Sequence, residues 1–332
     1  MARTSFNSLY LACTSLFLLS SGSAQTHFGD DRVTIATRVA AKPAAELSPA
    51  HLRVDMSLVL VPVHVTTPLG VSVTDLTKTN FQVYEDNVEQ TITHFSKDDA
   101  PLSIGLVFDA SASMRSKIHK SSEAAAAFFK TANAEDEFFL VEFNERPRLA
   151  IPFTFDSNEL YDHIVHTKTT GRTSLLDAIH MALLQMKKAA NSRKALVIVS
   201  DGGDNCSRYS FGQIKNALVE SDVQVYAMGI FDPQDSTKKR PPEEVKGPEL
   251  LSELAELSGG RHYPIDDLNE LPQISERIGL ELRNQYVLGY SPENLARDGK
   301  YRTIKLNLAA PPGMPALRTQ YRHGYYAPAP AQ

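Results

Sequence analysis

The stretch "GLVFDASASMRSK", residues 105–117, decides how this sequence is interpreted. It begins as a continuous apolar run, which is typical of a strand buried on both faces of a sheet. The run ends in three oxygen-bearing side chains at alternate positions, Asp109, Ser111 and Ser113. Carboxylates and hydroxyls are hard oxygen ligands, of the kind that Mg²⁺, Mn²⁺ or Ca²⁺ prefers and zinc does not. Because Asp and Ser also favour helix N-termini, a simple helix cap is the alternative interpretation.

The segments around this stretch predict the fold. Between residues 102 and 285, short apolar runs alternate with segments of helical period. Examples are the strand-like runs "KALVIVSD" (194–201) and "VQVYAMGI" (223–230), and the helical segment "SLLDAIHMALLQMKKA" (174–189). Strands that are apolar on both faces, separated by amphipathic helices, indicate a mostly parallel sheet covered on both sides. We therefore expect a doubly wound α/β domain.

β-rich sequence lies on both sides of this domain. "LVLVPVHVTT" (58–67) and "NFQVYEDNVEQTITHF" (80–95) precede it, and "YVLGYSP" (286–292) and "YRTIKLNLA" (301–309) follow it. We expect these strands to join into one small β-sandwich with the α/β domain inserted in its chain, although the order of segments also permits two separate β appendages. The expected boundaries are an N-terminal β segment at 53–98, the α/β domain at 99–285 and a C-terminal β segment at 286–327.

The first 24 residues have the features of a signal peptide. Arg3 supplies a positive charge, Leu9–Leu19 is mostly apolar, and small residues at 20–24 predict cleavage before Gln25. The apolar run is shorter than the roughly 20 residues that a membrane-spanning helix needs, and no other stretch of the sequence qualifies as a span. We expect export to the periplasm or the cell exterior, with residues 25–52 as a flexible linker.

Composition limits the possible functions. A formal net charge of −5 with 22% charged residues is ordinary for a soluble protein. Nucleic-acid binding would need a basic face, and none is indicated. After removal of the signal peptide, and of Cys13 with it, Cys206 is the one remaining thiol. An internal disulfide is therefore excluded, so the exported protein has to rely on its core.

Two further positions belong with the opening stretch. Ligands of an open α/β sheet bind beyond the carboxyl ends of its strands. Asp109 ends one predicted strand and Asp201 ends another, while Thr173 directly precedes a predicted helix between them. We expect all three loops to open on the same edge of the sheet. This would bring together two carboxylates and three hydroxyls.

The pattern Asp109-x-Ser111-x-Ser113, followed by Thr173 and Asp201, resembles the metal-ion-dependent adhesion site of the von Willebrand factor type A family, which has a Rossmann-like fold. The flanking segments "YVLGYSP", "DGKYRTIKLNL" and "RHGYYAP" resemble an exported, bacterial VWFA-related subfamily of acidobacterial type. The resemblance implies a magnesium site, with manganese or calcium as alternatives. It further implies that a partner protein supplies an acidic residue to the metal, in adhesion or envelope assembly.

The resemblance also implies a role for each residue. Ser111 and Ser113 would bind the metal directly, and Thr173 directly or through water. Asp109 and Asp201 would act mainly through water and supply most of the neutralising charge. Since the direct ligands are neutral hydroxyls, the cation would keep its attraction for an outside carboxylate.

Other candidates are weaker. His163 and His166 have a spacing that could bind a metal on a helix, but no third ligand is evident, so we interpret them as a solvated face. Arg115 and Lys117 are expected to be surface charges. No H-E-x-x-H, G-x-S-x-G or phosphate-binding loop is found. We therefore predict a protein that is not an enzyme. The alternatives are a Mg²⁺-dependent hydrolase of the cell envelope and a structural scaffold without a metal, and the sequence does not indicate an oligomeric state.

Overall fold

The computed structural model describes residues 58–97, 99–231 and 242–330, the last range without the side chains of 242–245. These residues belong to one compact unit, Val54–Gln332. The expected signal peptide at 1–24 and the linker at 25–52 lie outside the described ranges. Within those ranges, no helix has both the length and the apolarity that crossing a bilayer requires.

A six-stranded sheet forms the centre of the α/β domain, in the order β10-β9-β8-β5-β6-β7. Its strands are β5 (Leu102–Asp109), β6 (Glu137–Phe143), β7 (Pro147–Thr154), β8 (Arg193–Ser200), β9 (Gln224–Ile230) and β10 (Arg261–Ile265). All neighbouring strands are parallel except β7, which pairs antiparallel with β6 at the edge. Every residue of β5 and of β9 is buried, as expected for strands that are covered on both faces.

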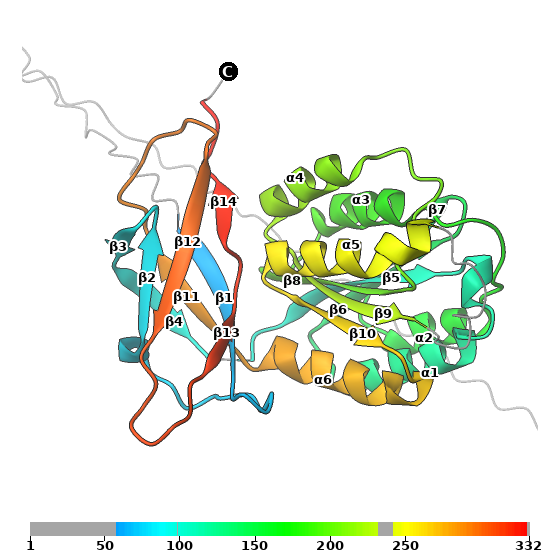
Figure 1. Ribbon diagram of the computed structural model, residues 1–332, viewed down its shortest axis with the longest axis horizontal. Helices are drawn as coiled ribbons and strands as arrows, with labels where there is room; N and C mark the ends of the chain where they lie inside the picture. Colours follow the sequence, from blue (N-terminus) through cyan, green and yellow to red (C-terminus); the bar gives the residue numbers. More distant parts are fainter. Residues whose placement is uncertain (1–57, 98, 232–241, 331–332) are drawn as a thin grey trace, which may run out of the picture. The chain divides into compact units, whose positions relative to one another are not determined.

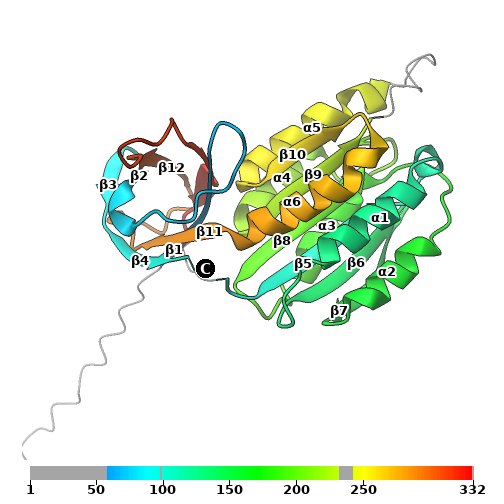
Figure 2. The same cartoon turned by 90° about the horizontal axis from the view of Figure 1, so that it is seen from below.

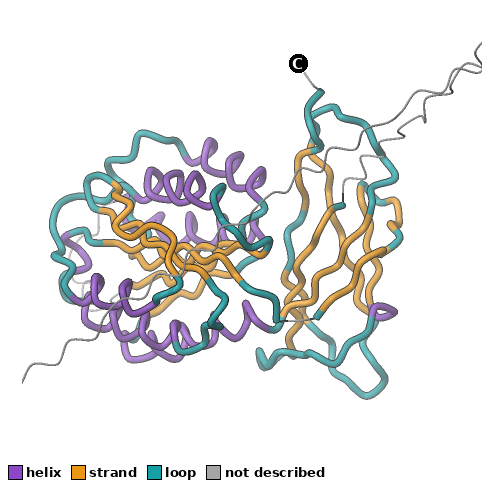
Figure 3. The backbone as a smooth tube through the Cα atoms, turned by 180° about the vertical axis from the view of Figure 1, so that it is seen from behind, coloured by secondary structure: helices purple, strands orange, loops and turns teal. Residues whose placement is uncertain are grey.

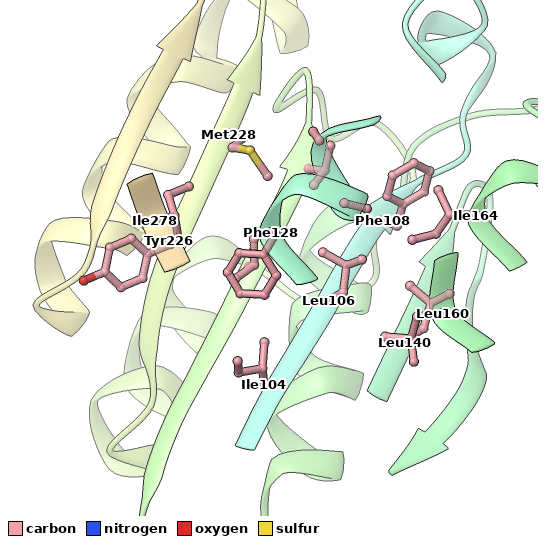
Figure 4. Close-up of a cluster of buried hydrophobic side chains, with 14 of the residues drawn as sticks. Ile104, Leu106, Phe108, Phe128, Leu140, Leu160, Ile164, Tyr226, Met228 and Ile278 are labelled. Atoms are coloured by element: carbon pink, nitrogen blue, oxygen red, sulfur yellow. The ribbon is translucent and has the colours of Figure 1, made fainter. Parts of the chain in front are cut away.

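Helices cover both faces of this sheet, three on each side (Figure 1). One layer holds α1 (Ile118–Phe129), α2 (Ser157–Val165) and α6 (Leu271–Arg283), and the other holds α3 (Leu175–Met186), α4 (Phe211–Ser221) and α5 (Pro242–Ser258). The first layer faces the viewer in Figure 2. Figure 4 shows part of the core beneath it, where Phe128 of α1 and Ile278 of α6 pack on Leu106 of β5 and Tyr226 of β9. The predicted doubly wound α/β fold is confirmed.

The flanking strands form two four-stranded antiparallel sheets (Figure 3). One has the order β13-β1-β11-β4 and the other the order β14-β12-β2-β3. These strands are β1 (Val59–Thr66), β2 (Phe81–Glu85), β3 (Val88–Gln90), β4 (Ile92–Ser96), β11 (Gln285–Tyr290), β12 (Tyr301–Leu308), β13 (Arg318–Gln320) and β14 (Gly324–Tyr326). The described residues also include the short 3-10 helices η1 (Lys78–Asn80), η2 (Ala112–Met114) and η4 (Leu268–Glu270).

Both small sheets combine strands from the two ends of the described chain. β1 pairs with β11 from Val59 opposite Tyr290, and β12 pairs with β2 from Ile304 opposite Glu85. Side chains of both sheets, among them Val61, Val83 and Ile304, share a single buried cluster. The strands therefore form one β-sandwich, with the α/β domain inserted between β4 and β11. The alternative of two separate β appendages is wrong.

Candidate metal centre

Asp109 is the last residue of β5 and is fully buried, with an exposed fraction of 0%. Its Oδ1 accepts a 2.8 Å hydrogen bond from the backbone N–H of Ser111, and its Oδ2 accepts a 2.5 Å bond from the hydroxyl of Ser200. Burial, together with the nearby charge of Asp201, raises the pKa of Asp109 to about 7, although the hydrogen bonds from Ser111 and Ser200 act in the opposite direction. A cation next to this carboxylate would favour its charged form.

Ser111 and Ser113 follow directly, where the chain turns from β5 into η2. Ser111 is buried and Ser113 is half-buried, and their hydroxyl oxygens lie 3.0 Å apart. Neighbouring ligands of an octahedral Mg²⁺, at metal–oxygen distances of about 2.1 Å, are separated by about 3.0 Å. The two hydroxyls share a hydrogen bond at this distance, and their separation also matches that of two adjacent ligands around such an ion.

Thr173 lies in the loop before α3 and is buried. Its backbone N–H donates a 3.0 Å hydrogen bond to Oδ1 of Asn205, and its carbonyl oxygen accepts bonds of 3.0 and 3.2 Å from the N–H groups of Asn205 and Cys206. Asn205 and Cys206 belong to the loop that follows Asp201. Backbone contacts thus hold the Thr173 loop against the Asp201 loop.

A second set of backbone contacts connects the Thr173 loop to the loop after β5. The N–H of Ala112 donates to the carbonyl of Gly171 at 3.1 Å, and the N–H of Thr170 donates to the carbonyl of Ala110 at 2.9 Å. Gly171 has a φ of 78°, a left-handed conformation that glycine adopts without strain. The loops that carry the predicted hydroxyls are therefore fixed to each other through their main chains.

Asp201 directly follows β8, which pairs in parallel with β5, so the two acidic residues end neighbouring strands. Its Oδ1 accepts a 3.3 Å hydrogen bond from the N–H of Gly203, and its Oδ2 lies 3.4 Å from Nζ of Lys117. Lys117 is buried and also donates to the carbonyl of Ile230 at 3.3 Å. The expectation that Lys117 is a surface charge is wrong, because its side chain turns inward to Asp201 and Ile230.

The five predicted residues thus come from one edge of the sheet, where β5, β8 and β9 end. We call this edge the carboxyl rim. Within the described ranges, no cluster of three or more His, Cys, Asp and Glu side chains could hold a metal. The candidate centre has only two carboxylates, and its further oxygen atoms are hydroxyls. Such a donor set contains oxygen atoms only, the ligands that hard divalent cations prefer.

Three further polar side chains, of Asp204, His163 and His166, have partners of their own. Asp204 accepts hydrogen bonds from the N–H of Leu176 at 3.4 Å and from the hydroxyl of Ser207 at 2.5 Å, so it fastens its loop to α3. His163 and His166 do not converge on a common ligand. Nε2 of His163 lies 2.7 Å from Oε2 of Glu142, whereas Nδ1 of His166 lies 2.7 Å from the carbonyl oxygen of Asp162.

The fold and the candidate centre together point to one class of protein: a doubly wound α/β domain with hydroxyls and carboxylates at its carboxyl rim. Comparison with a family model gives the same class. Residues 104–203 match the family model of the von Willebrand factor type A domain. This range begins in β5 and contains all five candidate ligands. This part of the chain is therefore a von Willebrand factor type A domain.

The chain is also similar to one curated protein and to several solved structures. An uncharacterized protein of Borreliella burgdorferi is 24% identical over 184 residues, which are 49% of this chain and 54% of that protein. The chain thus spans about half the length of this relative. The conserved hypothetical protein BatB from Bacteroides thetaiotaomicron is 16% identical, with a TM-score of 0.44, over 54% of this chain and 98% of that chain.

Two further structures have similar scores. The von Willebrand factor type A protein from Catenulispora acidiphila is 12% identical, with a TM-score of 0.48, over 69% of this chain and 66% of that chain. Proximal thread matrix protein 1 from the mussel byssus, whose MIDAS motif is occupied by zinc, is 17% identical, with a TM-score of 0.45, over 60% of this chain and 49% of that chain.

Proposed function

We propose that this chain is an exported, non-enzymatic binding protein that docks a partner protein through a divalent cation at the carboxyl rim. Mg²⁺ is the expected ion, with Mn²⁺ or Ca²⁺ as alternatives. One observation carries the proposal. Two hydroxyl oxygens, of Ser111 and Ser113, lie 3.0 Å apart beside two carboxylates that end neighbouring strands.

The donor set supports a division of roles. Ser111, Ser113 and Thr173 would hold the ion with neutral oxygen atoms, while Asp109 and Asp201 would supply negative charge from behind. A divalent cation bound mainly by neutral ligands keeps much of its positive charge. A carboxylate from a partner, an Asp or Glu side chain, would complete its coordination. Such a site binds an acidic residue of another protein.

The hydrogen bonds of the two acidic residues support a binding role, because they fix the orientation of both carboxylates. Asp109 accepts hydrogen bonds at both oxygens, from Ser111 and Ser200. Asp201 likewise accepts from Gly203 at one oxygen and from Lys117 at the other. Carboxylates held in this way are suited to orienting ligands and waters.

Export is the remaining part of the proposal. It rests on the sequence of residues 1–24, with a positive charge, a short apolar run and a small-residue cleavage site. In the periplasm or outside the cell, a cation-dependent binding domain would act in adhesion or in assembly of the envelope. A scaffold that uses the same fold without a metal is the alternative.

A pull-down from an envelope extract tests the metal and the partner together. The purified protein is used as bait in Mg²⁺ and in EDTA, beside the variants Ser113→Ala and Ser116→Ala. Ser116 is an exposed serine of the same segment and serves as the matched control. We expect a partner that is retained in Mg²⁺ by the wild type and by Ser116→Ala, and lost in EDTA and with Ser113→Ala. Binding that is equal in Mg²⁺ and EDTA would instead support the metal-free scaffold.

A further inference from the structure

Lys117 places a positive charge in the interior, beside the candidate metal centre. Its exposed fraction is 4%, and its Nζ lies 3.4 Å from Oδ2 of Asp201 and 3.3 Å from the carbonyl oxygen of Ile230. Lysine is almost never fully buried unless it is paired, because removing an ammonium group from water is costly. This buried position therefore indicates a specific electrostatic task.

The local fold brings Lys117 to this place. Its backbone N–H donates a 2.9 Å hydrogen bond to the carbonyl of Met114, whose side chain is fully buried in the core of the domain. The chain thus makes a tight turn between η2 and α1, with Lys117 as the residue before α1. This turn directs the lysine side chain toward Asp201 and Ile230.

The order of strands in the sheet shows from which side the ammonium group of Lys117 approaches Asp201. β8 lies between β5 and β9, so Asp201, at the end of β8, has one neighbouring loop on each side. Ser111 and Ser113 follow β5, whereas Ile230 is the last residue of β9. Because Nζ of Lys117 contacts Ile230, the ammonium group reaches Asp201 from the β9 side.

The formal charges of the centre can be added. With a cation bound, which favours the charged form of Asp109, Asp109 and Asp201 contribute two negative charges, Lys117 contributes one positive charge, and the three hydroxyl residues contribute none. The centre thus has one net negative charge. A divalent cation held there would keep one positive charge in excess. This charge would attract an anionic ligand from outside.

We infer that Lys117 is a built-in counter-charge of the metal centre, which weakens binding of the metal alone and so couples it to binding of an external carboxylate. This inference rests on the proposed function, because it concerns the same site. Charges a few ångströms apart in a protein interior interact strongly, so removal of the ammonium should strengthen Mg²⁺ binding by about tenfold or more.

Three variants separate the charge from the hydrogen bonds. Lys117→Gln keeps an N–H donor for Asp201 and Ile230 but removes the charge, whereas Lys117→Arg keeps the charge. Lys120→Gln is the matched control, since Lys120 lies one turn further along α1 and pairs with Glu123. Mg²⁺ is titrated into each purified protein by calorimetry at constant ionic strength, with and without acetate as a simple carboxylate probe.

We expect Lys117→Gln to bind Mg²⁺ about tenfold more tightly than the wild type. Lys117→Arg and Lys120→Gln should remain within about twofold of the wild type, since neither changes the charge next to Asp201. Acetate should strengthen Mg²⁺ binding more in the wild type than in Lys117→Gln. A merely structural role of Lys117 would not produce this difference.

The results that would contradict the inference differ from those that would contradict the proposed function. Equal or weaker Mg²⁺ binding by Lys117→Gln, with measurable binding by the wild type, overturns the inference and leaves the proposed function standing. Absence of binding in both proteins overturns the proposed function, and the inference with it. If Lys117→Gln does not fold without metal, a second variant, Lys117→Met, is prepared. Thermal unfolding of both variants is then measured in Mg²⁺ and in EDTA. Recovery of a folded state in Mg²⁺ supports the inference, and failure of both variants to fold in Mg²⁺ overturns it.

Discussion

Ser200 donates a 2.5 Å hydrogen bond from its hydroxyl to Oδ2 of Asp109, across the neighbouring strands β8 and β5. The same hydroxyl oxygen accepts a 3.0 Å bond from the N–H of Gly202. Gly202 directly follows Asp201. Ser200 therefore links the carboxylate at the end of one strand to the loop that carries the other carboxylate, and it fixes their relative position.

The variant Ser200→Ala tests this link. It leaves Oδ2 of Asp109 and the N–H of Gly202 without this partner in a buried place, which should lower the free energy of unfolding by about 1–3 kcal/mol. Mg²⁺ affinity should fall as well, because both acidic residues lose their fixed position. Urea unfolding and calorimetric titration measure the two effects. Ser221→Ala is the control, since Ser221 bonds to Leu218 within its own helix. A loss of stability with unchanged Mg²⁺ affinity would mean that Ser200 only supports the fold.

Asp109 itself should be required for stabilisation by the metal. An ion that binds only the native state stabilises it by mass action, by about 2.7 kcal/mol when its concentration is a hundred times Kd. The wild type should therefore melt at a higher temperature in millimolar Mg²⁺, and Asp109→Asn should not. The variant should stay folded, since an uncharged amide is less costly to bury than a carboxylate. Asp162→Asn, at an exposed position of α2, is the control. A Mg²⁺ shift that survives Asp109→Asn would place the ion elsewhere.

The closeness of the loops that begin at Asp109 and Asp201 could be predicted because parallel strands end at a common edge. A carboxylate after an apolar run, as at Asp109 and Asp201, is recognisable in the sequence, and the sheet order supplies their proximity. Lys117 and Ser200 could not be predicted in the same way. Whether a lysine in a serine-rich turn points inward depends on η2 and on the carbonyl of Ile230, more than 100 residues away.

The β-sandwich shows the same division between local pattern and long-range contact. The strand character of residues 58–67 and 286–292 follows from their composition, and a turn at Asp86 and Asn87 is visible as a break between two β-rich runs. The pairing of β1 with β11, by contrast, joins segments separated by the whole α/β domain. The strand pattern permits several partners for β1, and only packing of the complete core selects one.

His64 makes the stability of the fold dependent on pH. It lies buried in β1, and its Nε2 is 2.9 Å from the hydroxyl of Ser72. Burial lowers the pKa of His64 from 6.5 to about 4, with Arg261 and Arg277 acting in the same direction and Glu281, 3.6 Å from Nδ1, opposing them. Below pH 6.5 the unfolded chain takes up a proton that the folded protein does not take up until about pH 4.

Stability should therefore fall as the pH is lowered through this interval, by about 2 kcal/mol between pH 7.5 and pH 5 from His64 alone. Urea unfolding at both pH values measures the change. The variant His64→Gln should lose most of this dependence, whereas His119→Gln, at an exposed position of α1, should keep it. An equal pH dependence in the wild type and in His64→Gln would show that the pKa of His64 is the same in the folded and unfolded protein, because Glu281 fully offsets the effect of burial.

Gly247 of α5 lies against the loop of Asp201, and the backbone of the two segments leaves no room for a side chain. A Cβ at Gly247 would come within 2.7 Å of the carbonyl carbon of Gly202 and 2.8 Å of the carbonyl oxygen of Asp201. Gly247→Ala should therefore displace the Asp201 loop, lower stability by about 1–3 kcal/mol and weaken Mg²⁺ binding. Gly212→Ala in α4 is the control, because nothing lies within 4 Å of its Cβ. As alanine is the better helix former, this control should gain about 0.5–1 kcal/mol. If Gly247→Ala behaves like the control in both measurements, the contact between α5 and the Asp201 loop does not position the metal centre.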